Sequence, residues 1–429
     1  MKRWLLAGAL GVAFAPVALA QDAFDWKQFE GEEINLLLNN HPWTQAVRDM
    51  ADEFTQKTGI EMNIEVFNEE QFRARLTTLM QAQSSDIDVF MSLKSREGEV
   101  FNNAGWYADL TPMLEDPAMT SPDYNYEDFG EALREAETIG GKVIGVPLNL
   151  EGPLFYWRKD VFEECGIERP QFLEDILPAA EKLQECKPEM IPWAARGLRG
   201  AVPYALAAFV YNKGGDFKTV DGEPGLCEPA TIEAIDYYAT LLGQYGPPGA
   251  ANHTFTQVIE LLGQGRVAMV HESSNEFANV VRFPERAEDI GIDVLPESRE
   301  TGISRPVVIG WGLSVSEFSE DKGPAWYFLQ WVTSAEVQER LVDAGVAPPR
   351  TSVFEGPAFM AWASELPVRQ EWSDALVEIA ETGTSVYQSP TTRIPEARDI
   401  IGRAVQRVML GEQDAQTSAC QANEELKAL

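Results

Sequence analysis

The order of apolar segments near the start of the chain constrains the fold more than any other sequence feature. Three short runs, "INLLLNN" (34–40), "IEMNIEVF" (60–67) and "IDVFMSL" (87–93), are typical of strands. Between them, "WTQAVRDMADEFTQKTG" (43–59) and "EEQFRARLTTLMQAQ" (69–83) carry apolar side chains at helical spacing. Strands that alternate with helices predict a parallel sheet with helices on its faces.

Polar and aromatic side chains stand just beyond the first two of these strands. Asn40, His41 and Trp43 follow the first strand, and Asn68 follows the second. In such sheets, ligands bind at the loops beyond the carboxyl ends of the strands. We therefore predict that these residues help to form a ligand site.

The rest of the chain changes character twice. The segment 148–266 is rich in helical patterns such as "TIEAIDYYATLLGQYG", and strands return with "VAMVHE" (267–272), "IDVLP" (292–296) and "VVIGWGLSVS" (307–316). A chain of this length usually divides into lobes that have their own cores. The pattern predicts a chain that leaves one lobe, builds a second and returns to the first.

The first 20 residues form a separate unit. "MKRWLLAGALGVAFAPVALA" begins with Lys2 and Arg3, continues with an apolar stretch and ends in small residues at Ala20. This order is typical of a secretory signal peptide, and we predict cleavage after Ala20. The apolar stretch is shorter than the roughly 20 residues that a membrane-spanning helix needs, and no later segment approaches that length. We expect an exported protein whose mature chain begins at Gln21.

The mature chain is strongly acidic. Without Lys2 and Arg3, 32 of the 34 basic residues remain against 68 acidic ones, so the net charge is −36. This charge repels phosphate and argues against nucleic acid or an anionic membrane as a partner. The acidic residues are spread along the chain, which favours a solvated surface over a dedicated cation site.

Four cysteines are present in a chain that we expect to be exported, where disulfides persist. None has the close spacing of a zinc site, and four cysteines allow three pairings. Cys165 and Cys186 flank one helix-rich segment, and closing that loop would stabilise the fold by roughly 3 kcal/mol. We predict this pair together with Cys227–Cys420.

The order of segments resembles the extracellular solute-binding proteins of sugar-importing ABC transporters, the maltose-binding-like group. The resemblance covers essentially the whole mature chain and rests on the joint order of motifs that are weak individually. These motifs are "FTQKTGIEMNIEV", "SSDIDVFMS", "GWYADLTPML", "GKVIGVPLNLEGPLFYWRKDVFEECGI", "LLGQGRVAMVHESS", "GWGLSVSEFS", "AWYFLQWVTSAEVQ" and "VAPPRTSVF".

The resemblance implies an α/β protein with the two-lobed type II periplasmic-binding-protein fold, whose lobes close by hinge bending on a ligand in the cleft. One lobe would comprise 21–147 with 270–325, and the other 148–269 with 326–429. "VAMV" (267–270) would then be a crossover strand, and "HESSN" would emerge at the hinge and face the cleft. The implied partners are a small solute and an ABC permease in the inner membrane, and we expect a periplasmic monomer.

A cleft that binds sugars or polyols needs groups that donate and accept hydrogen bonds, and aromatic rings that cover C–H faces. Trp311 is the strongest candidate for such a ring, because the glycines on both sides let the backbone approach a ligand closely. The predicted ligand-binding residues are Asn40, His41, Trp43, Asn68, Asn149, Glu151, Trp193, Arg196, Glu272, Ser274, Trp311 and Arg350.

Catalysis and metal transport have little support in the sequence. Glu151 and Glu272 could form the acid–base pair of an exported glycoside hydrolase, but no hydrolase motif accompanies them. The three histidines, His41, His253 and His271, lack metal-site spacing. We therefore expect a binding protein without enzymatic activity, cofactor or metal.

The chemical class of the ligand stays open between several alternatives. Arg196, Arg350 and Lys94 would suit a phosphorylated or acidic sugar or a glycerol phosphate, whereas the acidic composition would suit a polyamine. Because both signs of charge are available, we favour a neutral sugar, oligosaccharide or polyol.

Overall fold

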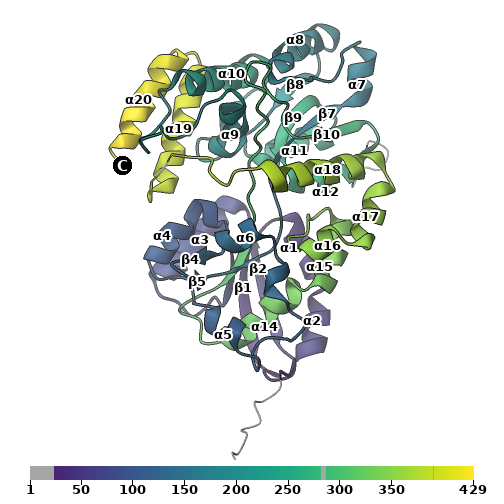
Figure 1. Ribbon diagram of the computed structural model, residues 1–429, viewed down its shortest axis with the longest axis vertical. Coiled ribbons are helices and arrows are strands. Elements are labelled where there is room, and N and C mark those ends of the chain that lie inside the picture. The colour runs from purple at the N-terminus through teal and green to yellow at the C-terminus, as the bar shows by residue number, and fades with distance from the viewer. Residues whose placement is uncertain (1–23, 282–286, 390) are drawn as a thin grey trace, which may run out of the picture.

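The computed structural model describes residues 24–281, 287–389 and 391–429. The predicted signal peptide and its cleavage point lie outside these residues. Figure 1 shows two lobes, one above the other, each built from a sheet and the helices that cover it. The predicted α/β class and two-lobed architecture are confirmed.

The sheet of the first lobe has the strand order β2-β1-β3-β11-β6. β1, β2 and β3 are mutually parallel, as the sequence predicts, and β11 runs antiparallel to both β3 and β6. Parallel strands bring their carboxyl ends to one edge, so Asn39 and Phe67 are register partners there. The strands are β1 (Glu33–Asn39), β2 (Glu61–Phe67), β3 (Val89–Ser92), β6 (Val146–Pro147) and β11 (Gly312–Val315).

Two helices of the first lobe begin directly at this edge. His41 caps α1 and Asn68 caps α3, each by accepting a hydrogen bond from a backbone N–H of the first turn. The predicted helix over 43–59 is divided in two at Met50. The helices of this lobe are α1 (Pro42–Asp49), α2 (Ala51–Thr58), α3 (Glu69–Gln81), α4 (Glu99–Asn103), α5 (Thr111–Glu115), α6 (Glu131–Ala136), α14 (Lys322–Val332) and α15 (Ala335–Leu341).

The second lobe contains a four-stranded sheet in the order β10-β7-β9-β8. Its central strand, β9, pairs antiparallel with β7 and parallel with β8, and all seven of its residues are buried. The strands are β7 (Pro153–Arg158), β8 (Ile191–Ala194), β9 (Val267–Ser273) and β10 (Ile290–Asp293). A small hairpin, β4 (Thr138–Ile139) with β5 (Lys142–Val143), precedes the first crossing between the lobes.

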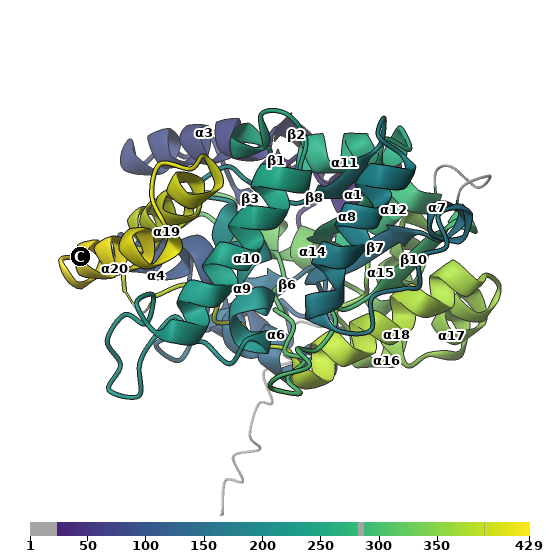
Figure 2. The ribbon, with the colours of Figure 1, turned by 90° about the horizontal axis from the view of Figure 1, so that it is seen from above.

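Helices cover this second sheet on both sides. Seen from above, α8 and α10 lie over it (Figure 2), and both pack against β8. On the other strands, α11 packs against β9 and α18 against β10. Besides α14 and α15, the described helices that follow β7 in sequence are α7 (Lys159–Glu164), α8 (Ile176–Cys186), α9 (Val202–Asn212), α10 (Pro229–Tyr245), α11 (Phe255–Gly263), α12 (Phe277–Val281), α16 (Thr351–Phe354), α17 (Pro357–Ser364), α18 (Pro367–Thr382), α19 (Ile394–Met409) and α20 (Ala415–Lys427).

Both predicted disulfides are confirmed within the second lobe. Cys165 is bonded to Cys186 across a separation of 21 residues. Cys227 is bonded to Cys420 across 193 residues, which ties the segment before α10 to α20. Each bond therefore holds a peripheral helix onto the lobe.

The strand pairing departs from the expected lobe boundaries at two places. The return to the first lobe was expected at residue 270, but β9 and β10 still pair within the second sheet, and the first lobe resumes with β11. "VAMV" is thus part of a central strand and not a crossover strand. The chain was expected to leave the first lobe for the second time at residue 326. Beyond that residue, however, α14 packs against β1 and β11, and α15 packs against α1, so both helices still belong to the first lobe.

Candidate functional site

A cavity of about 320 Å³ lies where the two lobes face each other. Its lining comes from the carboxyl ends of β1 and β2, from the end of β9, from the starts of α9 and α11, and from the segments that cross between the lobes. The lining residues are Asn39, Asn40, His41, Pro42, Asn68, Glu69, Glu70, Leu93, Arg96, Glu151, Arg196, Ala201, Tyr204, Thr254, Phe255, Thr256, Gln257, Ser273, Asn275, Glu276, Ile309, Trp311, Tyr387 and Arg398.

A chain of amide and imidazole groups joins the two lobes at this cavity. The Nδ2 of Asn275 lies 2.9 Å from the Nε2 of His41, and the Nδ2 of Asn149 donates to the Oδ1 of Asn275 over 3.1 Å. Burial lowers the pKa of His41 to about 4, so this imidazole is neutral at physiological pH. Asn149 in turn accepts from the backbone N–H of Trp311 at 2.9 Å and fixes that residue at the cavity wall.

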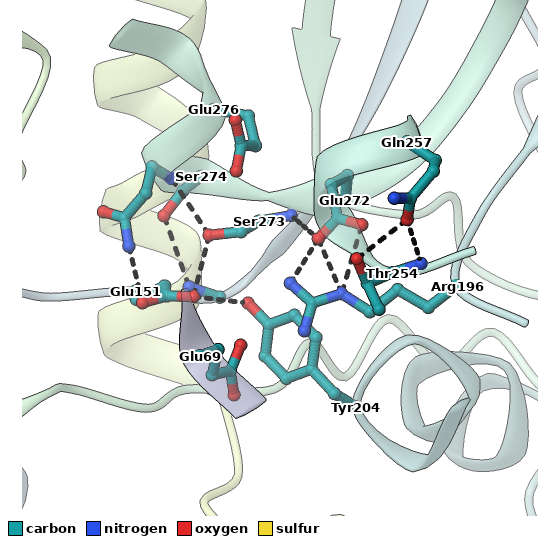
Figure 3. Close-up of polar contacts among 12 residues, drawn as sticks. Glu69, Glu151, Arg196, Tyr204, Thr254, Gln257, Glu272, Ser273, Ser274 and Glu276 are labelled. Atoms are coloured by element: carbon teal, nitrogen blue, oxygen red, sulfur yellow. Dashed lines mark hydrogen bonds and ion pairs between the residues drawn. The ribbon is translucent and has the colours of Figure 1, made fainter. Parts of the chain in front are cut away.

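Glu151 lies at the centre of the polar wall and is buried. Its Oε1 accepts from Ser273 at 2.8 Å and from Tyr204 at 3.2 Å, and its Oε2 accepts from Asn275 at 2.5 Å (Figure 3). Burial raises the pKa of the Glu151 carboxyl, and the hydrogen bonds from Ser273 and Tyr204 and the charge of Arg196 oppose the rise. The side chain is therefore engaged by the protein from several directions.

The end of β9 holds an arginine against the cavity. Glu272 is fully buried and forms a forked ion pair with Arg196, whose Nε lies 2.8 Å from one carboxylate oxygen (Figure 3). The guanidinium also lies over the ring of Tyr204, 4.4 Å from its centroid. Although burial lowers the pKa of Arg196, the Glu272 charge raises it above its usual range. Arg196 is thus a fixed, planar cation with its charge balanced.

On the opposite wall, Glu69 receives two arginines of the first lobe. It pairs with Arg73 and, at 3.1 Å, with Arg96. Although burial raises the pKa of Glu69, the charges of Arg73 and Arg96 hold it at about 2. The guanidinium of Arg73 also lies 5.3 Å from the ring centroid of Trp311, which gives that indole a defined orientation.

Glu276 introduces a neutral carboxyl group into the cavity. Burial, followed by the nearby charge of Glu272, raises the pKa of Glu276 to about 8. Its side chain accepts one hydrogen bond, from the Nδ2 of Asn279 at 2.6 Å. A protonated carboxyl both donates and accepts, so Glu276 can bind a hydroxyl group in either sense.

Six of the predicted ligand-binding residues line the cavity: Asn40, His41, Asn68, Glu151, Arg196 and Trp311. Three more lie directly behind the lining and hold it in place. Asn149 orients Trp311, Glu272 fixes Arg196, and the hydroxyl of Ser274 accepts from the backbone N–H of Gly152.

The other three predicted residues do not line the cavity. Trp43 and Trp193 are fully buried in the cores, because each lies on the inner face of its helix or strand. Trp193 packs between the rings of Phe155 and Phe209. Arg350 is 1% exposed, and its guanidinium donates hydrogen bonds to three backbone carbonyls and one carboxylate. A proline-rich loop is as compatible with such a structural role as with ligand contact.

The sequence interpretation missed most of the second-lobe wall. The starts of α9 and α11 contribute Tyr204, Thr254, Phe255 and Gln257 to this wall. At the start of a helix, the local sequence pattern is the same whether a side chain faces the cavity or the core. Arg398 belongs to an ordinary amphipathic helix, α19, and carries no local signal. Asn39 and Glu69 are different, because each directly precedes or follows a residue that was predicted from its position at a strand end.

Two properties of the described residues bear on other classes of protein. No helix in the described ranges combines the length and hydropathy needed to cross a membrane. Within the same ranges, no group of three or more His, Cys, Asp or Glu side chains is arranged to hold a metal ion.

Comparison with known proteins places the chain in one family. The model of the family described as "Bacterial extracellular solute-binding protein" matches residues 40–339. An erythritol/L-threitol-binding protein of Mycolicibacterium smegmatis is 26% identical over 352 residues, which are 77% of this chain and 73% of that protein. A probable amino-acid ABC transporter periplasmic-binding protein of Sinorhizobium fredii is 23% identical over 369 residues, 82% and 80% of the two chains.

A solved structure shares the fold over nearly the whole length. The ABC transporter solute-binding protein of Agrobacterium radiobacter, in complex with ribitol, superposes with a TM-score of 0.80. It is 22% identical, and the alignment covers 93% of this chain and 99% of that one. The fold is that of the type II periplasmic binding proteins, and this chain belongs to the bacterial extracellular solute-binding protein family.

Proposed function

We propose that this protein is the exported binding subunit of an ABC importer, and that it captures a small sugar or polyol in the cavity between its lobes. The observation that carries the proposal is the lining of that cavity, which combines amides, carboxyls and guanidinium groups from both lobes with the ring of Trp311. Such groups can match nearly every hydroxyl of a polyhydroxyl solute, and each unmatched buried hydroxyl would cost about 1–3 kcal/mol.

The size of the cavity narrows the class of solute. At about 320 Å³ it lies at the lower end of the range of small-molecule sites, roughly 300–1,000 Å³. This volume favours a polyol, a monosaccharide or a disaccharide over a long oligosaccharide. The names of the erythritol/L-threitol-binding relative and of the ribitol-bound structure support the same class.

Transport would follow from closure of the lobes. Groups from both lobes line one cavity, so a solute that contacts both walls binds the closed form better than the open form. The closed form would then be recognised by the permease in the inner membrane. We further propose that the chain acts in the periplasm as a monomer, after cleavage behind Ala20.

The geometry disfavours the two remote alternatives. Glu272 does not line the cavity and is committed to Arg196, so it cannot form an acid–base pair with Glu151 around a glycosidic bond. A polyamine would have to bind beside the guanidinium groups of Arg96, Arg196 and Arg398, which line the same cavity. We therefore propose a binding function without catalysis, cofactor or metal.

A thermal-shift screen tests the proposal. The ligand-stripped chain from Gln21 onward would be melted with polyols, sugars, amino acids and polyamines. A ligand at about 100 times its dissociation constant adds roughly 2.7 kcal/mol to the free energy of unfolding. We expect hits among sugars or polyols, and small-angle scattering should show compaction with the same compound. Hits only among amino acids or polyamines would overturn the proposed solute class.

A further inference from the structure

One buried cation of the cavity has no acidic partner among the described residues. Arg398, on α19, is 3% exposed and lines the cavity. Its Nε donates to the backbone oxygen of Gly200 at 2.9 Å, and its Nη1 donates to the Oε1 of Gln388 at 3.2 Å. Within the described ranges its Nη2 has no acceptor, and no carboxylate forms an ion pair with it. A buried arginine is normally paired with an acid.

A second arginine approaches the same point from the opposite lobe. Arg96, on the short helix Lys94–Gly98 of the first lobe, lines the cavity as well. Its Nη2 lies 3.9 Å from the position that a Cβ atom on Gly200 would occupy. Arg96 and Arg398 therefore both lie close to Gly200. The lobes contact each other beside them, where Gln388 donates to the backbone oxygen of Ser95 at 2.6 Å.

The acids near this corner pair with the other arginines. Arg73 and Arg96 share the carboxylate of Glu69, Arg73 also pairs with Glu97, and Arg96 has a distant, exposed second partner in Glu70. Among the described residues, none of these carboxylates forms an ion pair with Arg398. Burial, together with the positive charges of Arg96 and Arg73, lowers the pKa of Arg398 to about 10, although Tyr387 and Glu69 oppose the shift.

The contrast with Arg196 indicates what this corner is suited to bind. Arg196 also lines the cavity, but Glu272 neutralises it and occupies its fork. Glu151 cannot serve Arg398 in this way, because its oxygens already accept from Ser273, Tyr204 and Asn275. Arg398 has a free donor, a stacking partner in the ring of Tyr387 at 5.1 Å, and an uncompensated charge.

We propose that the corner of the cavity between Arg96 and Arg398 is an oxyanion subsite, which receives a carboxylate or phosphate group carried by a polyhydroxyl solute. This inference rests on the proposed function and narrows its substrate class to sugars or polyols that bear an acidic group. An oxyanion can accept from two guanidinium groups at once, and these charge-assisted bonds are the strong ones. Because the two arginines belong to different lobes, the anion also links the lobes in the closed form.

Calorimetric titration of matched compounds tests the subsite. The probes are trios that share one carbon skeleton: erythritol, erythronate and erythritol 4-phosphate, then the corresponding ribitol and mannitol trios. They are titrated into the ligand-stripped protein and into Arg398→Gln, Arg398→Lys and Arg393→Gln. Arg393 is the matched control, because it begins the same helix but is exposed and pairs with Glu396.

We expect one acidic member of a trio to bind roughly 10- to 100-fold tighter than its neutral partner. Arg398→Gln should abolish this preference by weakening the acidic compound far more than the neutral one, Arg398→Lys should restore part of the preference, and Arg393→Gln should not change it. A preference for carboxylates identifies sugar acids, and a preference for phosphates identifies sugar phosphates. Falling preference with rising salt would accompany either result.

Three outcomes would overturn the inference, and they differ in what they leave standing. If neutral members bind as well as acidic ones, the oxyanion subsite is wrong and the proposed function stands. If the preference survives in Arg398→Gln, the anion binds elsewhere in the cavity. If no member of any trio binds while the screen above also finds no sugar or polyol, the proposed function fails and the subsite with it.

Discussion

Two buried arginines of this protein show how differently the same side chain is used in two regions. Arg350, in the loop before α16, is 1% exposed, and Arg398, on α19, is 3% exposed. Arg350 donates to the backbone oxygens of Thr333, Asn125 and Tyr124, and it pairs with Asp128 at 3.2 Å. Arg398 makes two hydrogen bonds to neutral oxygens and keeps one donor group for the cavity.

The difference separates stability from function. Around Arg350, every donor group meets an acceptor and the ring of Phe129 lies 4.0 Å from the guanidinium, so the charge cross-links three loops. Around Arg398, the protein bears the cost of a buried charge without fully compensating it. A charge that is fully paired stabilises one folded arrangement, whereas a charge that is left incomplete at a cavity favours a ligand that completes it.

The largest effect is expected for the paired arginine. Arg350→Met should lower the free energy of unfolding by about 3–5 kcal/mol, because it removes the charge partner of Asp128 and one donor from each of three backbone carbonyls. Urea unfolding followed by circular dichroism measures the loss. The control is Arg340→Met, which removes an exposed pair with Glu53 and should cost less than about 1 kcal/mol. Equal stabilities of the two variants would contradict the role of Arg350 as a structural clamp.

The second effect concerns affinity and uses two tryptophans. Trp311→Ala removes one of the aromatic side chains that line the cavity and should weaken binding of the best ligand by about 2 kcal/mol, or about 30-fold. Trp193→Phe is the control, because Trp193 is fully buried away from the cavity. That variant should lower the melting temperature and keep the dissociation constant. Wild-type affinity in Trp311→Ala would remove Trp311 from the site.

The third effect concerns the pH dependence of stability and tests whether the pKa of the buried Glu276 carboxyl is raised. The pKa of Glu276 is raised from an ordinary 4.5 to about 8, so its contribution to stability is complete below about pH 4.5 and is lost as the pH rises through 8. The charges facing it are Glu272 and Glu151, which raise the pKa, and Arg196, which lowers it.

Glu276→Gln removes this loss, because an amide does not ionise. Relative to wild type, the variant should gain roughly 1 kcal/mol of stability between about pH 7 and pH 8. Melting temperatures of both proteins, measured without ligand across this interval, report the gain. Parallel pH profiles of the two proteins would show that the Glu276 carboxyl is not held neutral.

The smallest effect is expected for the incomplete arginine and is the sharpest test of the comparison. Arg398→Gln should change the free energy of unfolding without ligand by no more than about 1 kcal/mol, because the lost hydrogen bonds are offset by the removal of an uncompensated buried charge. A loss of stability as large as that of Arg350→Met, in the same urea titration, would show that Arg398 has the same structural role as Arg350.

The strand ends of the first lobe were predictable because the relevant physics is local. The period of apolar residues defines β1, α1, β2 and α3, and parallel pairing then forces Asn40, His41 and Asn68 to one edge. Glu151 was predicted from its place just past an apolar strand, and Trp311 from the glycines on both sides of it, and both residues line the cavity. For Trp43 and Trp193 such reasoning failed, because an aromatic residue near a strand end has the same local pattern whether it faces the cavity or the core.

The lobe boundaries were mispredicted for a related reason. "VAMV" is a short apolar run that fits a central strand or a crossover strand equally well, and only its pairing with both β7 and β8 decides between them. The helices α14 and α15 likewise have apolar faces, and an apolar face does not predict which of the two lobes a helix packs against.

The sequence by itself determined the alternation of strands and helices and the acidic composition, because periodicity and composition are local or additive properties, and its resemblance to a known family indicated the two-lobed fold. The disulfide pairs were predicted, but four cysteines allow three pairings, and only the structure decided between them. Only the tertiary structure decided which charges meet. Glu272 neutralises Arg196, Asp128 neutralises Arg350, and Arg398 is left without an acid among the described residues. Coulomb and desolvation energies depend on distance in space and on burial, and neither quantity is written in the order of residues.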